Sequence, residues 1–233
     1  MARFPKIFAA VARLCRQNML IIGLIGASVF CLFLLALRLA LSHNSTYSLM
    51  SRNLFLAWPP LASAFFAYKY HKKPAVVFRV TTALCVVLWL VFLPNAPYLV
   101  TDLVHFSPRY DMSLWFDLIM FVAYAVTGLL YGSISIYWMQ QLVRKMAGAA
   151  AGWLFVCGVS ALSSFGIYLG RFQRWNSWDV ISHPIGLLTD IWQNVRHPLS
   201  HFQTFAFSTL FTLFLMSVYL IVTALTHLSE ENR

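Results

Sequence analysis

The chain has 233 residues and a formal net charge of +10, with 60% hydrophobic residues and only 10% Asp, Glu, Lys or Arg. A soluble domain carries about 25% charged residues, so this chain lacks much of the polar surface that keeps a protein in water. The composition excludes an ordinary soluble enzyme, a disordered protein and a secreted disulfide scaffold. It predicts an all-α fold, a polytopic transmembrane helix bundle.

Residues 1–18 form a basic lead before the first long apolar run. Its residues Phe4, Ile7, Phe8, Val11 and Leu14 recur at helical spacing opposite the charges, which predicts an amphipathic helix on the cytoplasmic membrane surface. The apolar run that follows exceeds the 7–15 residues typical of a signal peptide. We therefore expect the first span to be retained.

Six apolar stretches approach or exceed the roughly 20 residues that a bilayer crossing needs. We expect Pro59 and Pro60 to kink the second stretch. No connector has room for a separate domain, so residues 19–225 are predicted to form one six-span membrane domain, with residues 226–233 as a cytoplasmic tail. The stretches cover residues 19–41, 54–70, 75–93, 112–139, 147–170 and 202–225.

The charges predict the orientation of the bundle. Eleven of the 17 Lys and Arg residues fall on the side of the N-terminus, which predicts that both termini are cytoplasmic. The positive charge is thus a topology signal that also suits contact with anionic lipid, and no nucleic-acid partner is expected. Five of the seven acidic residues and five of the seven histidines fall on the other side. We therefore expect any functional site to face outward.

The first outer segment follows the third span. Pro94 and Pro97 are expected to stop that helix, with a new helix beginning at Pro97. Asp102 and His105 would then share one face of it. Together they could ligate a divalent metal or act as an acid–base pair, or they could form a hydrogen bond that closes the loop. Asn95 is a candidate ligand-binding residue of the same segment.

The second outer segment begins at the end of the fifth span. Arg171 and Arg174 could hold a phosphate or carboxylate, with Asn176 as a further ligand-binding candidate. Alternatively, these arginines pair with Asp179 or Asp117. Asp179 is also a candidate catalytic residue, and Trp175 and Trp178 suit the membrane–water interface.

Three histidines extend the candidate metal set, which comprises Asp102, His105, His183, His197 and His201. We expect Pro198 to start the last helix, with His197 at its cap and His201 one turn in. The glutamate of the H-E-x-x-H zinc motif is missing, so the spacing of these two histidines alone is a weak signal.

Two motifs carry a resemblance to a known family. They are Asn95-Ala96-Pro97-Tyr98 with Thr101-Asp102-Leu103, and Gly170-Arg171-Phe172 with the run from Arg174 to Asp179. From about Leu54 to Leu225 the chain resembles an uncharacterised family of bacterial integral-membrane proteins, a domain of unknown function. The resemblance implies a multi-pass protein of the bacterial plasma membrane and supplies no activity, ligand or catalytic residue.

The fifth span carries G-x-x-x-G spacings at Gly148 and Gly152 and at Gly166 and Gly170. Small residues let helices approach closely, so we expect this span to be central in the bundle. The same glycines could also form a homo-oligomer interface. The sequence has no nucleotide-binding or serine-hydrolase motif.

Two functional hypotheses remain open. The first is a non-enzymatic membrane component, a scaffold, binding protein or small permease, in which the outer polar residues tie the loops together. The second is an outward-facing enzyme, dependent on a metal or on acid–base chemistry, that acts on a phosphate-bearing lipid or envelope precursor. In that case Asp102, His105 and Asp179 would do the chemistry, while Arg171 and Arg174 would hold the anionic headgroup.

Overall fold

The computed structural model describes residues 4–70, 75–107, 112–197, 200 and 202–231. Within these ranges the chain is helical and contains no strand, so the all-α prediction is confirmed. The elements are α1 (Phe4–Ser42), α2 (Leu49–Leu56), α3 (Trp58–Tyr70), α4 (Ala75–Phe92), α5 (Asn95–Thr101), the 3-10 helix η1 (Asp102–His105), α6 (Leu114–Phe172), α7 (Asp179–Ser182), α8 (Pro184–Arg196) and α9 (Phe202–Glu231).

Four helical stretches among the described residues are long and apolar enough to cross a membrane. They are Met19–Ser42, Arg79–His105, Leu114–Phe172 and Phe202–Thr226. The predicted stretch 54–70 is not among them, because the helix is interrupted at Ala57 and α3 has only 13 residues. The expected interruption of this stretch is present, because α2 ends at Leu56 and α3 begins at Trp58. Pro59 and Pro60 lie in the first turn of α3, where a missing N–H costs little.

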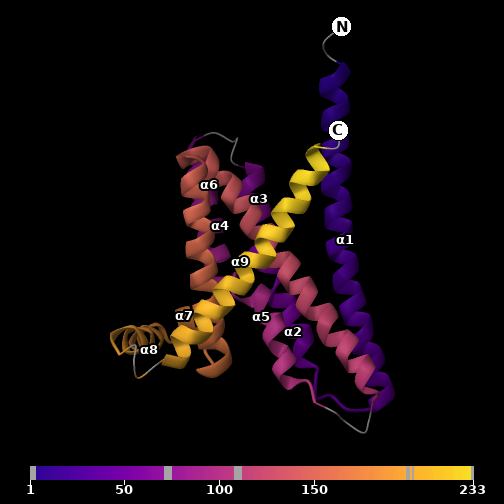
Figure 1. Cartoon of the computed structure of the whole chain (residues 1–233), viewed down its shortest axis with the longest axis vertical. Coiled ribbons are helices and arrows are strands. Elements are labelled where there is room, and N and C mark those ends of the chain that lie inside the picture. Colours follow the sequence, from indigo (N-terminus) through magenta and orange to yellow (C-terminus); the bar gives the residue numbers. More distant parts are fainter. Residues whose placement is uncertain (1–3, 71–74, 108–111, 198–199, 201, 232–233) are drawn as a thin grey trace.

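The fourth and fifth predicted stretches are merged in α6, which has 59 residues. At 1.5 Å per residue a straight helix of this length would span about 88 Å, nearly three times the roughly 30 Å of a bilayer core. The helix instead bends at Gly148, whose φ of 88° and ψ of 174° are non-helical. Figure 1 shows α6 folded into a hairpin with two antiparallel arms.

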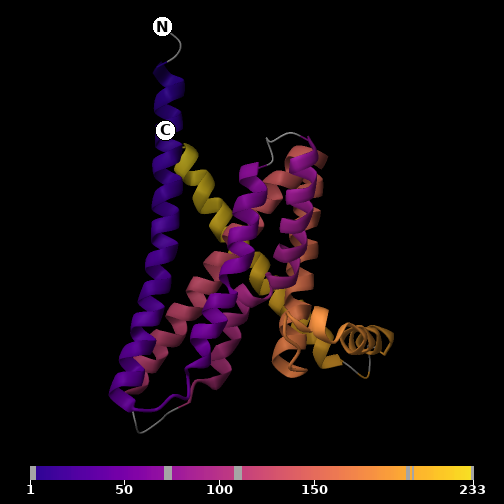
Figure 2. The same cartoon turned by 180° about the vertical axis from the view of Figure 1, so that it is seen from behind.

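The helices run between two ends of the molecule. The start of α1 and the bend of α6 lie at one end, which we call the N-terminal end; α2, α5, α7 and α8 lie toward the other (Figures 1 and 2). We call the latter the Asp102 end. The basic lead, predicted as a separate surface helix, continues the helix of the first span without a break from Phe4 to Ser42. Its placement on a membrane surface stays a prediction.

The short helix α5 packs against both arms of α6 through glycines. A Cβ atom at Gly128, on the first arm, would clash with the carbonyl oxygen of Ala96. On the second arm, a Cβ at Gly166 would lie 2.8 Å from Cγ of Pro94. The absence of side chains at these two positions therefore lets α5 sit deep in the hairpin, which fixes the residues that follow it.

The other glycines of the G-x-x-x-G pattern also have neighbours within the chain. A Cβ at Gly152 would meet Arg144, and one at Gly170 would meet Tyr98 and the carbonyl oxygen of Trp175, whereas Gly148 is open. Homo-oligomer formation through these glycines stays a prediction. The α6 stretch has the largest buried share of the four candidate spans, 61%.

Two helix starts differ from the sequence prediction. The new helix after α4 begins at Asn95 with Pro94 at its N-cap, two residues before Pro97. His197 is the C-cap of α8 rather than the N-cap of the last helix, which begins at Phe202. Pro198 and His201 lie outside the described residues.

Candidate functional site

The first outer segment carries a buried carboxylate. Asp102 begins η1 directly after α5 and is only 3% exposed. One of its oxygens, Oδ1, accepts a charged hydrogen bond from Nη2 of Arg171 at 2.5 Å. The other, Oδ2, accepts one from Nδ2 of Asn53 at 2.9 Å. Both oxygens are thus satisfied within the protein, which is what a buried carboxylate requires.

Arg171 connects the two outer segments. Besides Asp102, its guanidinium donates from Nε and Nη2 to the hydroxyl of Thr101, at 3.0 and 2.8 Å. It lies over the ring of Tyr98, with Cζ 4.3 Å from the centroid. The predicted alternative of pairing with Asp179 or Asp117 is not what forms; the partner is Asp102. Arg171 therefore joins the end of α6 to α5 and η1.

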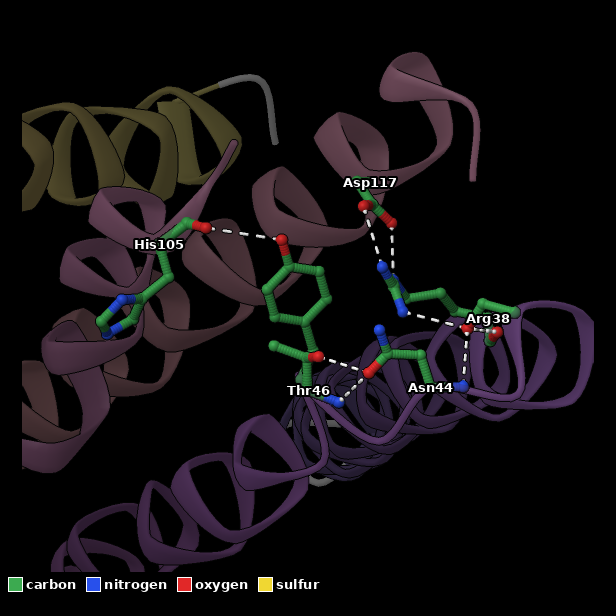
Figure 3. A network of polar contacts seen from close by, with 7 residues as sticks. Arg38, Asn44, Thr46, His105 and Asp117 are labelled. Atoms are coloured by element: carbon green, nitrogen blue, oxygen red, sulfur yellow. Dashed lines mark hydrogen bonds and ion pairs between the residues drawn. The ribbon is translucent and has the colours of Figure 1, made fainter. Parts of the chain in front are cut away.

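His105 also contacts Arg171. Asp102 and His105, which were predicted to share one face, therefore meet the same guanidinium. Its Nε2 lies 2.8 Å from Nη1 of Arg171. A guanidinium can only donate, so Nε2 is the acceptor and the proton of the neutral ring lies on Nδ1. On the backbone side, the hydroxyl of Tyr47 donates to the carbonyl oxygen of His105 at 3.4 Å (Figure 3).

These residues line a cavity of about 430 Å³ at the Asp102 end. Its charged lining consists of three arginines and one carboxylate, so the cavity is cationic. Arg171 and Asp102 neutralise each other, whereas Arg52 and Arg174 form no ion pair or side-chain hydrogen bond with any residue in the described part of the chain. The lining residues are Thr46, Tyr47, Leu49, Met50, Arg52, Asn53, Tyr98, Asp102, His105, Phe121, Gly170, Arg171 and Arg174.

Arg174 occupies an unusual backbone position. The N–H groups of Gln173 and Trp175 both bond to the carbonyl oxygen of Leu169 as α6 ends. Arg174, between them, has a φ of 63°. This left-handed position after a helix is usually glycine, because a Cβ there costs about 1 kcal/mol or more. The chain accepts that strain at a residue whose side chain lines the cationic cavity.

A second cavity, of about 170 Å³, adjoins the first. The two share the lining residues Arg52, Asn53, Tyr98 and Gly170. The remaining wall of the second cavity carries amide and indole side chains, namely Asn95, Trp175, Asn176 and Trp178, beside Ser177 and apolar residues.

Asn95 and its neighbours show how the two outer segments meet. Nδ2 of Asn95 donates to the hydroxyl of Ser177 at 2.7 Å and to the carbonyl oxygen of Phe92 at 3.1 Å. The two predicted ligand-binding residues Asn95 and Asn176 therefore line one cavity, while Arg171 and Arg174 line the other.

Asp179 and His183 lie elsewhere, in and beside α7. Oδ2 of Asp179 accepts the backbone N–H of Asn176 at 2.7 Å, and Oδ1 accepts the hydroxyl of Ser182 at 3.0 Å. The Asn176 N–H is the main reason that the pKa of Asp179 is below its ordinary value. His183 is exposed, with Nδ1 3.8 Å from Asp179. Neither residue lines the two cavities, and Asp179 instead stabilises a local turn.

The predicted metal set is spread over several elements. Asp102 and His105 share the cationic cavity, His183 lies before α8, His197 ends α8, and His201 is outside the described residues. Within the described ranges, no three His, Cys, Asp or Glu side chains form a group suited to a metal ion. Metal binding by this set stays a prediction.

Asp117 belongs to a separate buried ion pair. Arg38 of α1 donates from Nε to Oδ1 of Asp117 at 2.9 Å and from Nη2 to Oδ2 at 3.4 Å. Arg38 also lies over the ring of Tyr47, 4.4 Å from its centroid. Figure 3 shows this pair beside the loop that carries Asn44 and Thr46. The pair holds α1 against the first arm of α6 and does not line either cavity.

Sequence reasoning did not select Arg52 and Asn53 as site residues. They lie in α2, within Leu49-Met50-Ser51-Arg52-Asn53-Leu54-Phe55-Leu56, a segment interpreted only as the approach to the second span. The signal that could have identified them is an arginine followed by an asparagine within the mostly apolar segment Leu49–Leu56.

Residues 52–218 match the family described as "Protein of unknown function (DUF1361)". The chain belongs to this family. No curated protein and no solved structure matches the chain. The matched region begins at Arg52 and includes every residue of the second cavity, as well as Asp102, Arg171 and Arg174. The predicted membership of an uncharacterised family is confirmed.

Proposed function

We propose that this DUF1361 protein is a multi-pass protein of the bacterial plasma membrane that binds a phosphate-bearing group in the cationic cavity. The observation that carries the proposal is a pair of guanidinium groups, Arg52 and Arg174, that have no partner within the described ranges and lie beside an arginine whose charge Asp102 already neutralises. A planar guanidinium is suited to a phosphate because it can donate two parallel hydrogen bonds. Arg171 acts as the support of the site and the other two arginines as its ligand-binding groups.

The adjoining cavity suits an uncharged polar part of the same ligand. Oδ1 of Asn95 and of Asn176 and the hydroxyl of Tyr98 have no hydrogen-bond partner among the described residues, so they can bond to ligand hydroxyl or amide groups. The indoles of Trp175 and Trp178 add apolar surface beside them. A phosphate joined to a polar headgroup would fill both cavities.

The topology that goes with this proposal has six crossings, with both termini cytoplasmic. Support comes from the hairpin of α6, which supplies two antiparallel arms, and from α2 and α3, which together run back from the Asp102 end (Figure 2). Under the positive-inside rule, the excess of Lys and Arg at the N-terminal end favours a location outside the cell for the Asp102 end and both cavities.

The enzymatic alternative receives less support from the geometry. Each oxygen of Asp102 already accepts one hydrogen bond within the protein, and Nε2 of His105 accepts one from Arg171. These contacts tie the two segments together, so we propose binding without chemistry as the function.

Binding can be tested with purified protein in detergent by thermal unfolding. The probes are inorganic phosphate, dihexanoyl phosphatidic acid and, as a zwitterionic comparison, dihexanoyl phosphatidylcholine. We expect the phosphatidic acid to raise the melting temperature, because a ligand that binds only the folded state stabilises it by mass action. Stabilisation by phosphate alone would identify a soluble anion as the ligand, and stabilisation by neither anionic probe would overturn the proposal.

The variants Arg52→Gln and Arg174→Gly should each weaken binding about tenfold, the loss expected for one charged hydrogen bond of about 1.4 kcal/mol. The matched control is Arg196→Gln, which removes an exposed arginine at the end of α8 that lines neither cavity. Equal losses in all three variants would show that overall charge, and not the cavity, attracts the anion.

A further inference from the structure

The helix α8 lies beside the bundle rather than in it. It contains Pro184–Arg196, with Pro184 in its first turn. Figures 1 and 2 show it at the Asp102 end, projecting from the base of the second arm of α6 and lying across the direction of the long helices. A helix of 13 residues is about 20 Å long, too short to cross a bilayer.

The polar side of α8 faces the protein. Asn194 is only 1% exposed, and its Oδ1 accepts hydrogen bonds from Thr204 of α9 at 3.0 Å and from Gln173 at 3.3 Å. One turn earlier, Oδ2 of Asp190 accepts the indole N–H of Trp175 at 2.9 Å. One more turn back, a Cβ at Gly186 would lie 3.2 Å from the same indole. Positions four residues apart thus form one docking face, attached to both α6 and α9.

The apolar side of α8 faces away from the protein. Its residues recur at spacings of three and four, which places them on one face of a helix. All of them are more than half exposed, although an aqueous protein would bury such a stripe. They are Ile185 at 80%, Leu188 at 64%, Trp192 at 62% and Val195 at 55%, preceded by Ile181 at 87%.

This amphipathicity is the reverse of that of a helix on a water-soluble protein, where the apolar stripe packs inward. Rotation of α8 about its axis to bury the stripe would break the hydrogen bonds of its polar side. The stripe therefore needs an apolar environment outside the chain.

We propose that α8 is an interfacial helix whose apolar stripe lies in the boundary between headgroups and acyl chains, in the membrane leaflet at the Asp102 end. The neighbouring α9, which Thr204 joins to Asn194 of α8, also exposes apolar side chains, with Phe202 at 72% and Leu210 at 69%. Trp192 is the residue type that favours this depth. A second copy of the chain fits less well, since the stripe has five side chains and a stable interface needs about 20–30 residues from each side.

The position of α8 also fixes the depth of the second cavity. Trp175 lines that cavity and is bonded to Asp190 of α8. A helix held in the interface would keep the indole, and with it the cavity wall, at headgroup level. This inference concerns the membrane surface alone and does not depend on whether the cationic cavity binds an anion.

The contact can be tested by photo-crosslinking of the full chain in nanodiscs of phosphatidylcholine and phosphatidylglycerol. p-Benzoylphenylalanine is placed at Leu188, in the stripe, and, as the matched control, at Thr189, an exposed neighbour outside the stripe. We expect phospholipid adducts, measured by mass spectrometry, to be about fivefold more frequent at 188 than at 189, because only the first position points to the acyl region.

Three outcomes would overturn the proposal: equal lipid labelling at both positions, no lipid adduct at 188, or a covalent dimer of the chain from 188. As a second measurement, Leu188→Asp should speed amide hydrogen exchange throughout α8 in nanodiscs, while Thr189→Asp should leave it unchanged. Unchanged exchange in both variants would also contradict the interfacial placement.

Discussion

Two buried arginine–aspartate pairs hold the Asp102 end of the molecule together at the scale of single residues. Arg38 with Asp117 joins α1 to α6, and Arg171 with Asp102 joins the end of α6 to η1. A buried carboxylate without a partner would be costly, so each aspartate is fixed by its arginine. Arg174 differs from both arginines because it is exposed, has no ion-pair partner in the described part of the chain, and is held at a positive φ.

Substitutions at Asp102 and Arg174 should therefore change the free energy of unfolding in opposite directions. Asp102→Ala leaves the largely buried guanidinium of Arg171, 11% exposed, without its counter-charge, and we expect a loss of about 3 kcal/mol. Arg174→Gly removes a side chain without an ion pair or side-chain hydrogen bond among the described residues and relieves the left-handed strain, so we expect a gain of up to about 1 kcal/mol. Chemical or thermal unfolding in detergent measures both, and a clear destabilisation by Arg174→Gly would contradict the assignment of Arg174 to ligand binding alone.

At the scale of secondary-structure elements, three glycines determine how α5 and the two arms of α6 pack together. Gly128 and Gly166 let α5 approach the two arms of α6, and Gly148 lets the arms reverse. The backbone at Gly148 lies in a region that is essentially restricted to glycine. The fourth and fifth predicted spans are therefore antiparallel neighbours because of one residue.

Gly148→Ala should destabilise the protein by about 1–3 kcal/mol, since a Cβ is strained at that φ and ψ even in open space. The matched control is Gly158→Ala, a helical glycine of the same α6 whose Cβ would also meet nothing within 4 Å. That change should be neutral or stabilise by up to about 1 kcal/mol, because alanine favours helix. Equal effects in thermal unfolding would show that the bend does not depend on the glycine backbone.

At the scale of the whole molecule, the relevant features are the lengths of the apolar helices and the distribution of charge between the two ends. Three of the four apolar stretches have few buried residues: the buried share is 11% in Phe202–Thr226 and 28% in both Met19–Ser42 and Arg79–His105, against 61% in α6. The helices α2, α5 and α8 lie toward one end of the molecule, opposite the bend of α6 (Figure 1), and residues of α2 and α5 line both cavities. The candidate binding groups and α8 are thus concentrated at one end of the long axis.

Epitope insertions test the proposed orientation of that axis. An epitope inserted at Asn44, between α1 and α2, should be accessible to antibody on intact spheroplasts, whereas one inserted beside Gly148 should need permeabilised membranes. The reason is the excess of Lys and Arg at the N-terminal end. The reverse labelling would place the cationic cavity in the cytosol, and labelling of both insertions from outside would contradict the six crossings.

The sequence by itself predicted the all-α fold and long apolar helices, and it singled out two segments whose residues the structure brings together. These depend on local composition and on short motifs, and Asp102, His105, Arg171 and Arg174 do share one cavity. The start of the helix after α4 was misplaced, because a proline can occupy an N-cap, as Pro94 does, as well as a first turn. His197 was assigned to the start of the last helix, whereas it ends α8.

Only the tertiary structure decided which charged side chains form ion pairs with one another. Arg171 has Asp102 as its partner and Arg38 has Asp117, whereas Asp179 bonds to its own turn. Arg52 and Arg174 have no ion-pair partner within the described residues, and the apolar stripe of α8 is exposed. The physical reason is that pairing depends on distances between segments far apart in sequence, which spacing along the chain does not encode.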